Sequence, residues 1–327
     1  MSLSEIQKLV KAVRGGDRRA LGRAITLVES IREDHREQAE HLQEALLPHR
    51  VDSIRVGISG VPGVGKSTFI EALGQHIINK GRRIAVLAVD PSSKLSGGSI
   101  LGDKTRMETL SRQQNAFIRP SPAGTTLGGV ARRTREAISI CEAARYDVVL
   151  VETVGVGQDE VDIARASHTT IVVSAPGLGD GIQAIKAGIL EIADIHVVSK
   201  CDRSDANFTL RDLKTSLLPG GDRAQKATWV APIIATSAIE EQGFDDLIKA
   251  IQNHRTVAFD SDAGRKRQQH IAAFRLHKTA EAMLLDHFGS MVKKGSAPLV
   301  ARLEQRNTDP YSAAEEMLAA FLKAGVR

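Results

Sequence analysis

The sequence predicts an α/β fold in which a mostly parallel central sheet is flanked by helices, with further helical segments at both ends of the chain. Two observations lead to this prediction. Between residues 51 and 256, short β-branched runs alternate with longer amphipathic segments, and strand–helix alternation of this kind builds a parallel sheet covered by helices. Outside this region the β-branched runs stop, and apolar residues recur at helical spacing.

The central region, residues 51–256, contains the predicted strands and is expected to form one domain. Right-handed crossovers between parallel strands bring all the strand carboxyl ends to one edge of the sheet. Loops that follow strands should therefore meet at that edge. The predicted strands are IRVGIS (54–59), IAVLAV (84–89), DVVLV (147–151), TTIVVS (169–174), IHVVS (195–199) and PIIAT (232–236).

Two helical regions flank this domain. Residues 1–50 are predicted to form a helical extension, in which Gly15-Gly16 separates two helical segments. Residues 257–327 are predicted to form a helical arm. The arm begins with one long helix over 264–291, and two shorter helices are expected around 297–305 and 310–324. Helices outside a complete α/β core need another surface to pack on.

Composition excludes several classes of protein. The 327 residues are 42% hydrophobic and 25% charged, as in ordinary globular proteins, and the net charge of +5 is mild. Two cysteines are too few for a disulfide scaffold or a zinc knuckle, which indicates a reducing compartment. The apolar runs are too short to span a bilayer, and no secretory signal is visible. We therefore expect a soluble cytoplasmic protein with no membrane partner. We also expect no nucleic-acid partner, because aromatic residues do not alternate with the basic ones.

A phosphate-binding loop follows the first predicted strand. The segment GVPGVGKST (60–68) matches Gly-x-x-x-x-Gly-Lys-Ser and opens a helix, which is the context that this motif requires. Its glycines allow backbone N–H groups to turn toward a phosphate, Lys66 adds a positive charge, and Ser67 offers a hydroxyl to Mg²⁺. The predicted phosphate-binding residues are Gly60, Val61, Pro62, Gly63, Val64, Gly65, Lys66, Ser67 and Thr68.

Carboxylates at other strand ends complete the predicted metal and catalytic groups. Glu152 ends the strand 147–151, and Asp90 ends the strand 84–89; both are expected to bind Mg²⁺ directly or through water, and to serve catalysis with Lys66. Asp103, in the Gly/Ser-rich loop after Asp90, is a further metal candidate. Gly155 offers an N–H to the γ-phosphate. Val156 stands where many GTPases have a glutamine that orients water, so hydrolysis by the chain alone should be slow.

The segment VVSKCD (197–202) resembles the Asn-Lys-x-Asp loop by which GTPases recognise guanine, with Ser199 in the asparagine position. The Asp202 carboxylate is expected to accept hydrogen bonds from the two ring donors that adenine lacks, with the Lys200 stem over the base. Guanine preference should therefore persist, with weaker binding. Downstream, Ser237 and Ala238 lie in a Thr-Ser-Ala segment where GTPases contact the guanine oxygen.

One further glycine-rich loop, SAPGLGDGIQAIKAGILEIAD (174–194), leads from a strand to a helix. It is either a third mobile element near the nucleotide or a plain connection in which Asp180 begins the helix.

Taken together, these segments resemble the MeaB/ArgK family, the bacterial relatives of the methylmalonic aciduria type A protein. The resemblance rests on GVPGVGKST, AVDPSS…SGGSILGDKTRM, ETVGVGQ, PGLGDGIQAIKAGI, KCD and TSA, and covers nearly the whole chain. It implies a P-loop GTPase of the SIMIBI class, with GTP or GDP as ligand and Mg²⁺ as cofactor. It also implies a homodimer formed through the helical arm.

The resemblance further implies a chaperone of adenosylcobalamin-dependent methylmalonyl-CoA mutase, which gates cofactor loading, protects the mutase from inactivation and is stimulated by it. The loop 177–189 would then couple hydrolysis to the mutase through Asp180, Gln183 and Lys186. Three alternatives remain open at this point: an ATP-dependent kinase, a nickel-insertion GTPase, and a binding module without turnover.

Overall fold

The computed structural model describes residues 1–30, 32–90, 107–122, 129–153, 167–177, 193–217 and 229–324. The chain divides into two compact units, Met1–Ala272 and Ala273–Arg327. The first unit contains the sheet and the N-terminal helices, and the second contains most of the C-terminal helical region.

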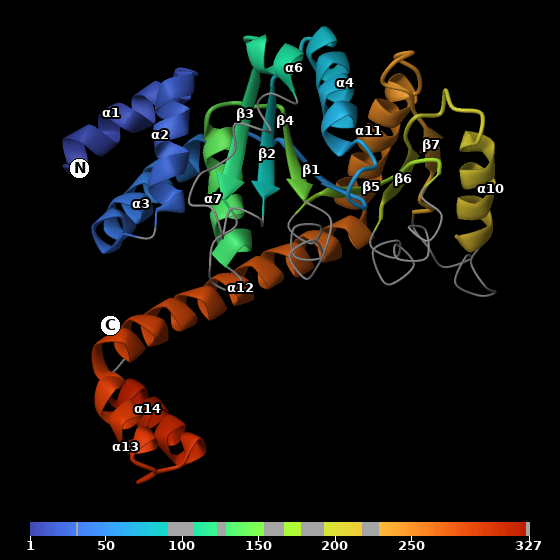
Figure 1. Ribbon diagram of the computed structural model, residues 1–327. Coiled ribbons are helices and arrows are strands. Elements are labelled where there is room, and N and C mark those ends of the chain that lie inside the picture. Colours follow the sequence, from blue (N-terminus) through green and yellow to red (C-terminus); the bar gives the residue numbers. More distant parts are fainter. Residues whose placement is uncertain are drawn as a thin grey trace. The chain divides into compact units, whose positions relative to one another are not determined.

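Within the described residues, seven parallel strands form one sheet in the order β3-β2-β4-β1-β5-β6-β7 (Figure 1). This arrangement confirms the predicted α/β class and the six predicted strands, and it adds β3, which the sequence pattern did not indicate. The carboxyl ends of all the strands lie at one edge of the sheet. The strands are β1 (Ile54–Ser59), β2 (Ile84–Asp90), β3 (Ala116–Pro122), β4 (Val148–Thr153), β5 (Thr169–Ser174), β6 (Ile195–Val198) and β7 (Ile233–Ala235).

Helices cover both faces of the sheet. One face packs against α7, and α1, α2 and α3 pack on α7 in turn; the other face packs against α4, α6 and α11 (Figure 1). The helices that precede the arm are α1 (Leu3–Arg14), α2 (Arg18–Glu29), α3 (Glu33–Leu46), η1 (Leu47–His49), α4 (Lys66–Asn79), α6 (Glu108–Arg112), α7 (Gly129–Ala143), α10 (Ala206–Ser216) and α11 (Phe244–Asp260).

Strand β2 contributes side chains to the buried clusters on both faces of the sheet. Ile84 and Val86 belong to the cluster on the α4 side, whereas Ala85 and Leu87 belong to the cluster on the α7 side. All four side chains are buried. Because side chains alternate across a strand, a continuous apolar run is what a strand covered on both faces requires.

The turn between α1 and α2 follows from its sequence. Gly16 has a φ of 81°, a left-handed conformation that glycine adopts without strain. The next residue, Asp17, is the N-cap of α2, and its carboxylate accepts hydrogen bonds from the Arg19 and Ala20 N–H groups at 2.8 and 3.0 Å.

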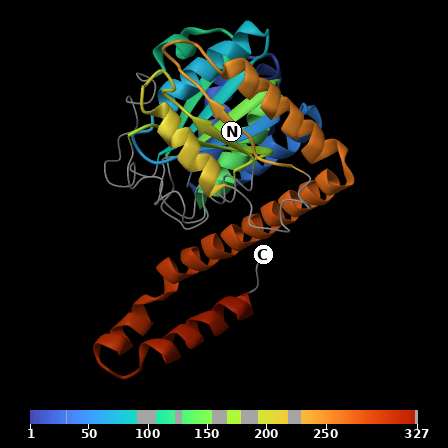
Figure 2. The same ribbon diagram turned by 90° about the vertical axis from the view of Figure 1, so that its right-hand side faces the viewer.

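The second unit contains the later part of α12 (Asp262–Gly295), then α13 (Ala297–Glu304) and α14 (Pro310–Ala324). The chain turns back after α12 (Figure 2), and the rings of Phe288 and Phe321 meet edge-on at 5.4 Å. Several large apolar side chains of this unit are nevertheless exposed: Leu276, Met283, Leu284, Leu285, Val300, Leu318 and Leu322.

Candidate functional site

The glycine-rich loop 60–65 connects the end of β1 to the start of α4 at the carboxyl edge of the sheet. Gly60 has a φ of 154°, and a Cβ atom built on it would lie 2.3 Å from the carbonyl oxygen of Val173 in β5. Only glycine fits such a close approach of two backbones. Gly63 and Gly65 also have positive φ, at 83° and 89°. The loop therefore has the tight turn that a phosphate cradle needs.

Lys66 begins α4, and its side chain folds back over the loop. Its Nζ donates hydrogen bonds to the carbonyl oxygens of Gly60, at 2.6 Å, and Val61, at 3.4 Å. The side chain is buried at 8% exposure. An ammonium bonded to neutral carbonyls gains stronger partners when phosphate oxygens become available, because hydrogen bonds between two charged groups are the stronger kind.

The predicted metal ligands Ser67 and Glu152 lie together. The Ser67 Oγ is 3.4 Å from Oε1 of Glu152, whose side chain is 7% exposed at the end of β4. Glu152 aligns with Ala88 of β2, so Asp90, two residues further along β2, ends at the same edge. A carboxylate and a hydroxyl are oxygen donors of the kind that Mg²⁺ prefers. The donor set present here fits that ion.

Ser199 follows β6 and joins the expected guanine loop to the phosphate loop. Its hydroxyl lies 3.1 Å from the Val64 carbonyl oxygen and 3.0 Å from that of Ser174, at the end of β5. Ser199 is buried, and its N–H also donates to Ser174, at 2.8 Å. The short hydroxyl therefore contacts the phosphate loop and the sheet edge at once.

Lys200 and Asp202 lie in the loop that follows β6. Lys200 has a left-handed φ of 56°, and its Cε lies 3.5 Å from the Cβ position of Gly65, so its stem runs beside the phosphate loop. The Asp202 carboxylate accepts a hydrogen bond of 2.5 Å from the Ser237 hydroxyl. Three segments that lie far apart in the sequence thus converge on one edge of the sheet.

The loop after β7 is fixed by backbone contacts. Ser237 and Gln242 exchange N–H···O bonds of 3.2 and 3.0 Å, and the Cys201 N–H donates to the Thr236 carbonyl oxygen at 3.0 Å. Ala238 follows in the same turn. Burial, with the charges of Asp202 and Glu240, raises the pKa of the Cys201 thiol, which keeps it protonated beside the carboxylate.

Two residues in this arrangement were missed by sequence reasoning. Ser174 supplies the carbonyl oxygen that Ser199 contacts. Gly243 has a φ of 80°, and its Cβ would lie 2.0 Å from the Ala235 carbonyl oxygen, so it closes the loop after β7. A glycine between a strand and an amphipathic segment was an available signal for Gly243, whereas nothing in the sequence distinguishes Ser174.

Other predicted site residues lie outside the described residues. These are Asp103, Gly155, Asp180, Gln183 and Lys186, and the side chain of Asp90 is also undescribed. Their roles stay predictions.

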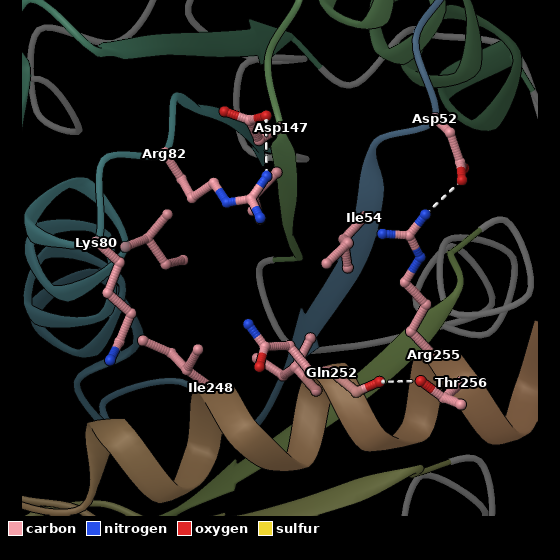
Figure 3. A pocket seen from close by; sticks show the side chains of 12 residues that line it. Asp52, Ile54, Lys80, Arg82, Asp147, Ile248, Gln252, Arg255 and Thr256 are labelled. Atoms are coloured by element: carbon pink, nitrogen blue, oxygen red, sulfur yellow. Dashed lines mark hydrogen bonds and ion pairs between the residues drawn. The ribbon is translucent and has the colours of Figure 1, made fainter.

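A separate pocket of about 440 Å³ lies at the opposite, amino edge of the sheet, between α4 and α11 (Figure 3). Its apolar lining includes Ile54 and Ile248. Its charged groups are paired: Arg82 with Asp147 at 3.5 Å, Arg255 with Asp52, and Lys80 with Asp245 at 2.8 Å. Because these cations already have carboxylate partners, the pocket offers little free charge to an anion.

Known proteins resemble this chain in both sequence and fold. The family model described as "Methylmalonyl Co-A mutase-associated GTPase MeaB" matches residues 21–293. The chain belongs to the MeaB family. It is 48% identical over 321 residues to a protein of Mycobacterium bovis named "Probable GTPase", covering 96% of this chain and 94% of that protein. MeaB-family membership, with the loop geometry above, makes the chain a P-loop GTPase.

Two further relatives extend the family likeness. "GTPase ArgK" of Escherichia coli is 41% identical over 280 residues, covering 85% of this chain and 84% of that protein. A mouse protein named "Methylmalonic aciduria type A homolog, mitochondrial" is 38% identical over 332 residues, covering 97% and 79%. The crystal structure of a "LAO/AO transport system kinase" aligns with a TM-score of 0.73 at 30% identity, covering 99% of both chains.

Within the part of the chain that the structure describes, none of the helices combines the length and the apolar character that a membrane span requires.

Proposed function

We propose that this MeaB-family GTPase binds GTP with Mg²⁺, hydrolyses it slowly by itself, and acts as a chaperone of methylmalonyl-CoA mutase. In this role it gates loading of the adenosylcobalamin cofactor and protects the mutase from inactivation. The observation that carries the nucleotide assignment is the Ser199 hydroxyl, which lies against both the phosphate loop and the end of β5. That contact, with the Lys200 Cε 3.5 Å from the Gly65 Cβ position, supports a base-binding role for Lys200 and Asp202 next to the loop that would cradle the triphosphate.

The residues have distinct tasks in this proposal. Lys66 exchanges its bonds to the Gly60 and Val61 carbonyls for the β- and γ-phosphate oxygens and stabilises charge there in the transition state. Ser67 and Glu152, together with Asp90 and Asp103, would hold Mg²⁺, which when bound would neutralise charge on the phosphate oxygens. The helix N-terminus at Lys66 adds its dipole.

Asp202 supplies base specificity. Its carboxylate, already oriented by the Ser237 hydroxyl, accepts from the N1–H and the exocyclic amine of guanine. Adenine has neither donor in that position. A clear preference for GTP over ATP in steady-state hydrolysis is the expected result. Equal or faster ATP hydrolysis would instead favour a kinase, the activity for which the solved relative is named.

Asp202→Asn tests the assignment more sharply than a loss of activity does. An asparagine amide donates where the carboxylate accepted, so it should disfavour the guanine amine and donate a hydrogen bond to the carbonyl oxygen that xanthine has in its place. We expect at least a tenfold loss of GDP affinity and a gain for xanthosine diphosphate, because a buried unpaired polar group costs roughly 1–3 kcal/mol. The matched control is Asp212→Asn, on α10. Loss of both nucleotides in the Asp202 variant would contradict the assignment.

The mutase partner rests on the description of the family model, which names a mutase-associated GTPase. The test is the GTPase rate with and without methylmalonyl-CoA mutase. A partner that completes the active site raises hydrolysis well above about twofold. Stimulation should be lost when Asp180, Gln183 or Lys186 is replaced by alanine, while hydrolysis by the chain alone stays unchanged. A GTPase rate that does not respond to the mutase would contradict the partner assignment and leave the assignment of GTPase activity unaffected.

The proposed homodimer rests on the apolar side chains that the second unit leaves exposed. Leu276 is 67% exposed and Leu284 is 53% exposed on α12. Exposed apolar groups that gather on one segment mark interaction surfaces more often than chance exposure does. A second copy of the arm would cover them.

A further inference from the structure

The first unit has a second pocket at the amino edge of the sheet, on the side of α1 and α2. Its volume is about 650 Å³, and it is lined by five arginines and a single carboxylate. They come from the α1–α2 turn, from the residue before β2 and from the turn before β4: Arg14, Asp17, Arg18, Arg19, Arg83 and Arg145. We call this the arginine pocket. The phosphate loop lies at the opposite, carboxyl edge.

The single carboxylate does not neutralise the arginines. Asp17 caps α2, and its Oδ1 accepts from two backbone N–H groups, those of Arg19 and Ala20. Among the residues that the structure describes, no carboxylate forms an ion pair with any of the five arginines. This contrasts with the pocket of Figure 3, where three cations each have a carboxylate partner.

Two of the arginines are fixed in place by uncharged partners. Arg83 donates to the carbonyl oxygens of Ala144 and Arg145, at 2.8 and 3.3 Å, and its guanidinium lies 4.4 Å from the centre of the Tyr146 ring. Arg18 donates to two backbone carbonyls, 3.3 and 3.2 Å away, in the segment before β3. The pocket wall is therefore ordered, and its positive charge is not cancelled.

The position of Arg18 and Arg19 has a cost for the fold. They are the first two residues of α2, and the negative charge at this helix end comes from the N-cap Asp17, since the first turn itself contains no acidic residue. Positive side chains are unfavourable at a helix N-terminus, where the backbone already presents partial positive charge. Asp17 offsets part of this charge, and a bound anion would offset what remains on the clustered guanidinium groups.

We propose that the arginine pocket binds a small molecule that bears a diphosphate group. None of the five arginines forms an ion pair with the described residues, and Asp17 offsets one of their charges, so about four positive charges remain in the pocket wall, which suits a diphosphate better than a single phosphate or carboxylate. Guanidinium groups pair with phosphate oxygens in a planar, bidentate geometry. The volume lies in the range of small-molecule sites, roughly 300–1,000 Å³. The site does not depend on the proposed nucleotide function, because it uses other residues at the other edge.

The test is calorimetric titration of the full-length chain with inorganic pyrophosphate in magnesium-free buffer. All variants carry Lys66→Ala, which removes the main cation of the phosphate loop. Arg14→Gln with Arg19→Gln is compared with Arg23→Gln and Arg211→Gln, which remove the same charge from arginines outside the pocket. We expect at least a tenfold loss of pyrophosphate affinity in the pocket variant and less than about twofold in the control, since each lost charged hydrogen bond costs roughly 1.5–3 kcal/mol.

Adenosine diphosphate and orthophosphate, used as further probes, separate the sources of the group. Tighter binding of adenosine diphosphate than of pyrophosphate identifies a nucleotide-borne diphosphate, and the reverse identifies the free ion. Equal losses in the two double variants would overturn the proposal, as would abolition of all binding by Lys66→Ala alone. Binding of poly-glutamate with no binding of pyrophosphate would overturn it in favour of an acidic protein partner. Thermal melting of each variant confirms folding, and pyrophosphate should raise the melting temperature only where the pocket is intact.

Discussion

Ser199 takes the asparagine position of the guanine loop, and its contacts define what the substitution changes. We expect Ser199→Ala to lower GDP affinity by about threefold to tenfold, because one hydroxyl bond to Val64 or Ser174 contributes roughly 0.5–1.5 kcal/mol. The ratio of GDP to ADP affinity should stay unchanged, since Asp202 is untouched. Titration with fluorescent GDP and ADP analogues measures both. A variant that lost its base preference would show that Ser199, and not Asp202, selects the base.

His196 is buried in the middle of β6, and burial lowers its pKa to about 4. Between about pH 4 and pH 6.5, the unfolded pKa, the imidazole of His196 is protonated in the unfolded chain but not in the folded chain. The contribution of this residue to the free energy of unfolding is therefore fully present above pH 6.5 and is lost progressively as the pH is lowered. We expect a loss of about 2 kcal/mol between pH 7 and pH 5 from this residue.

Urea unfolding of the wild-type chain and of His196→Leu at both pH values isolates this effect. Other groups titrate in both proteins, so the difference between their pH dependences belongs to His196. If the two proteins lose the same stability on acidification, the buried imidazole is not the cause.

The sequence predicts which segments of the candidate site meet at one edge of the sheet, but not the contacts between them. The order of loops after strands fixes which edge Lys66, Glu152 and Asp202 share. It does not predict that Ser237 donates to Asp202, because that contact depends on how the loop after β7 closes around Gly243.

At the scale of elements, the strand that the sequence pattern did not indicate is β3. Its sequence, AFIRPSP, contains two prolines, which argue against a strand in the middle of a sheet. In the structure β3 is the first strand in the sheet order and pairs with β2 alone, so one side of its backbone needs no partner. Proline is compatible with that edge position, and single-sequence patterns do not say which strand is at the edge.

The contact between α4 and α6 depends on a glycine inside a helix. A Cβ atom on Gly74 would lie 2.6 Å from Cδ2 of Leu110, which is fully buried. Gly74→Ala should therefore destabilise the fold by roughly 1–3 kcal/mol through overpacking, although alanine is the better helix former. The matched control is Gly22→Ala in α2, whose Cβ would meet nothing within 4 Å and which should stabilise by about 1 kcal/mol.

A double-mutant cycle with Leu110→Ala shows whether this contact is the cause. The Gly74 substitution should cost much less once the leucine is shortened, because the new methyl group then has room. Additive losses in urea unfolding would mean that Gly74 is needed for another reason.

At the scale of the whole molecule, the N-terminal helices and the sheet form one unit. Residues of α1, α2 and α3 share a buried cluster with α7 and with one face of β2, β3 and β4. Sequence periodicity predicts these helices, but it does not show that their apolar faces pack on α7. The helical spacing of apolar residues also predicts the helices of the arm, but it does not indicate which of those apolar residues stay exposed.

The exposed apolar residues of α12 allow the proposed dimer to be tested in the intact chain. Leu276→Glu with Leu284→Glu adds two charges where a second copy would pack, so sedimentation velocity should show a shift from dimer to monomer. The control, Leu3→Glu with Phe208→Glu, adds the same charge at exposed apolar positions of the first unit and should leave the sedimentation coefficient unchanged. Both leucines of the arm are already largely exposed within the chain, so the thermal stability of the monomer should change little, since surface substitutions usually shift stability by less than about 0.5 kcal/mol. A monomeric wild-type chain, or a double variant that remains dimeric, would mean that this face of α12 has another role than self-association.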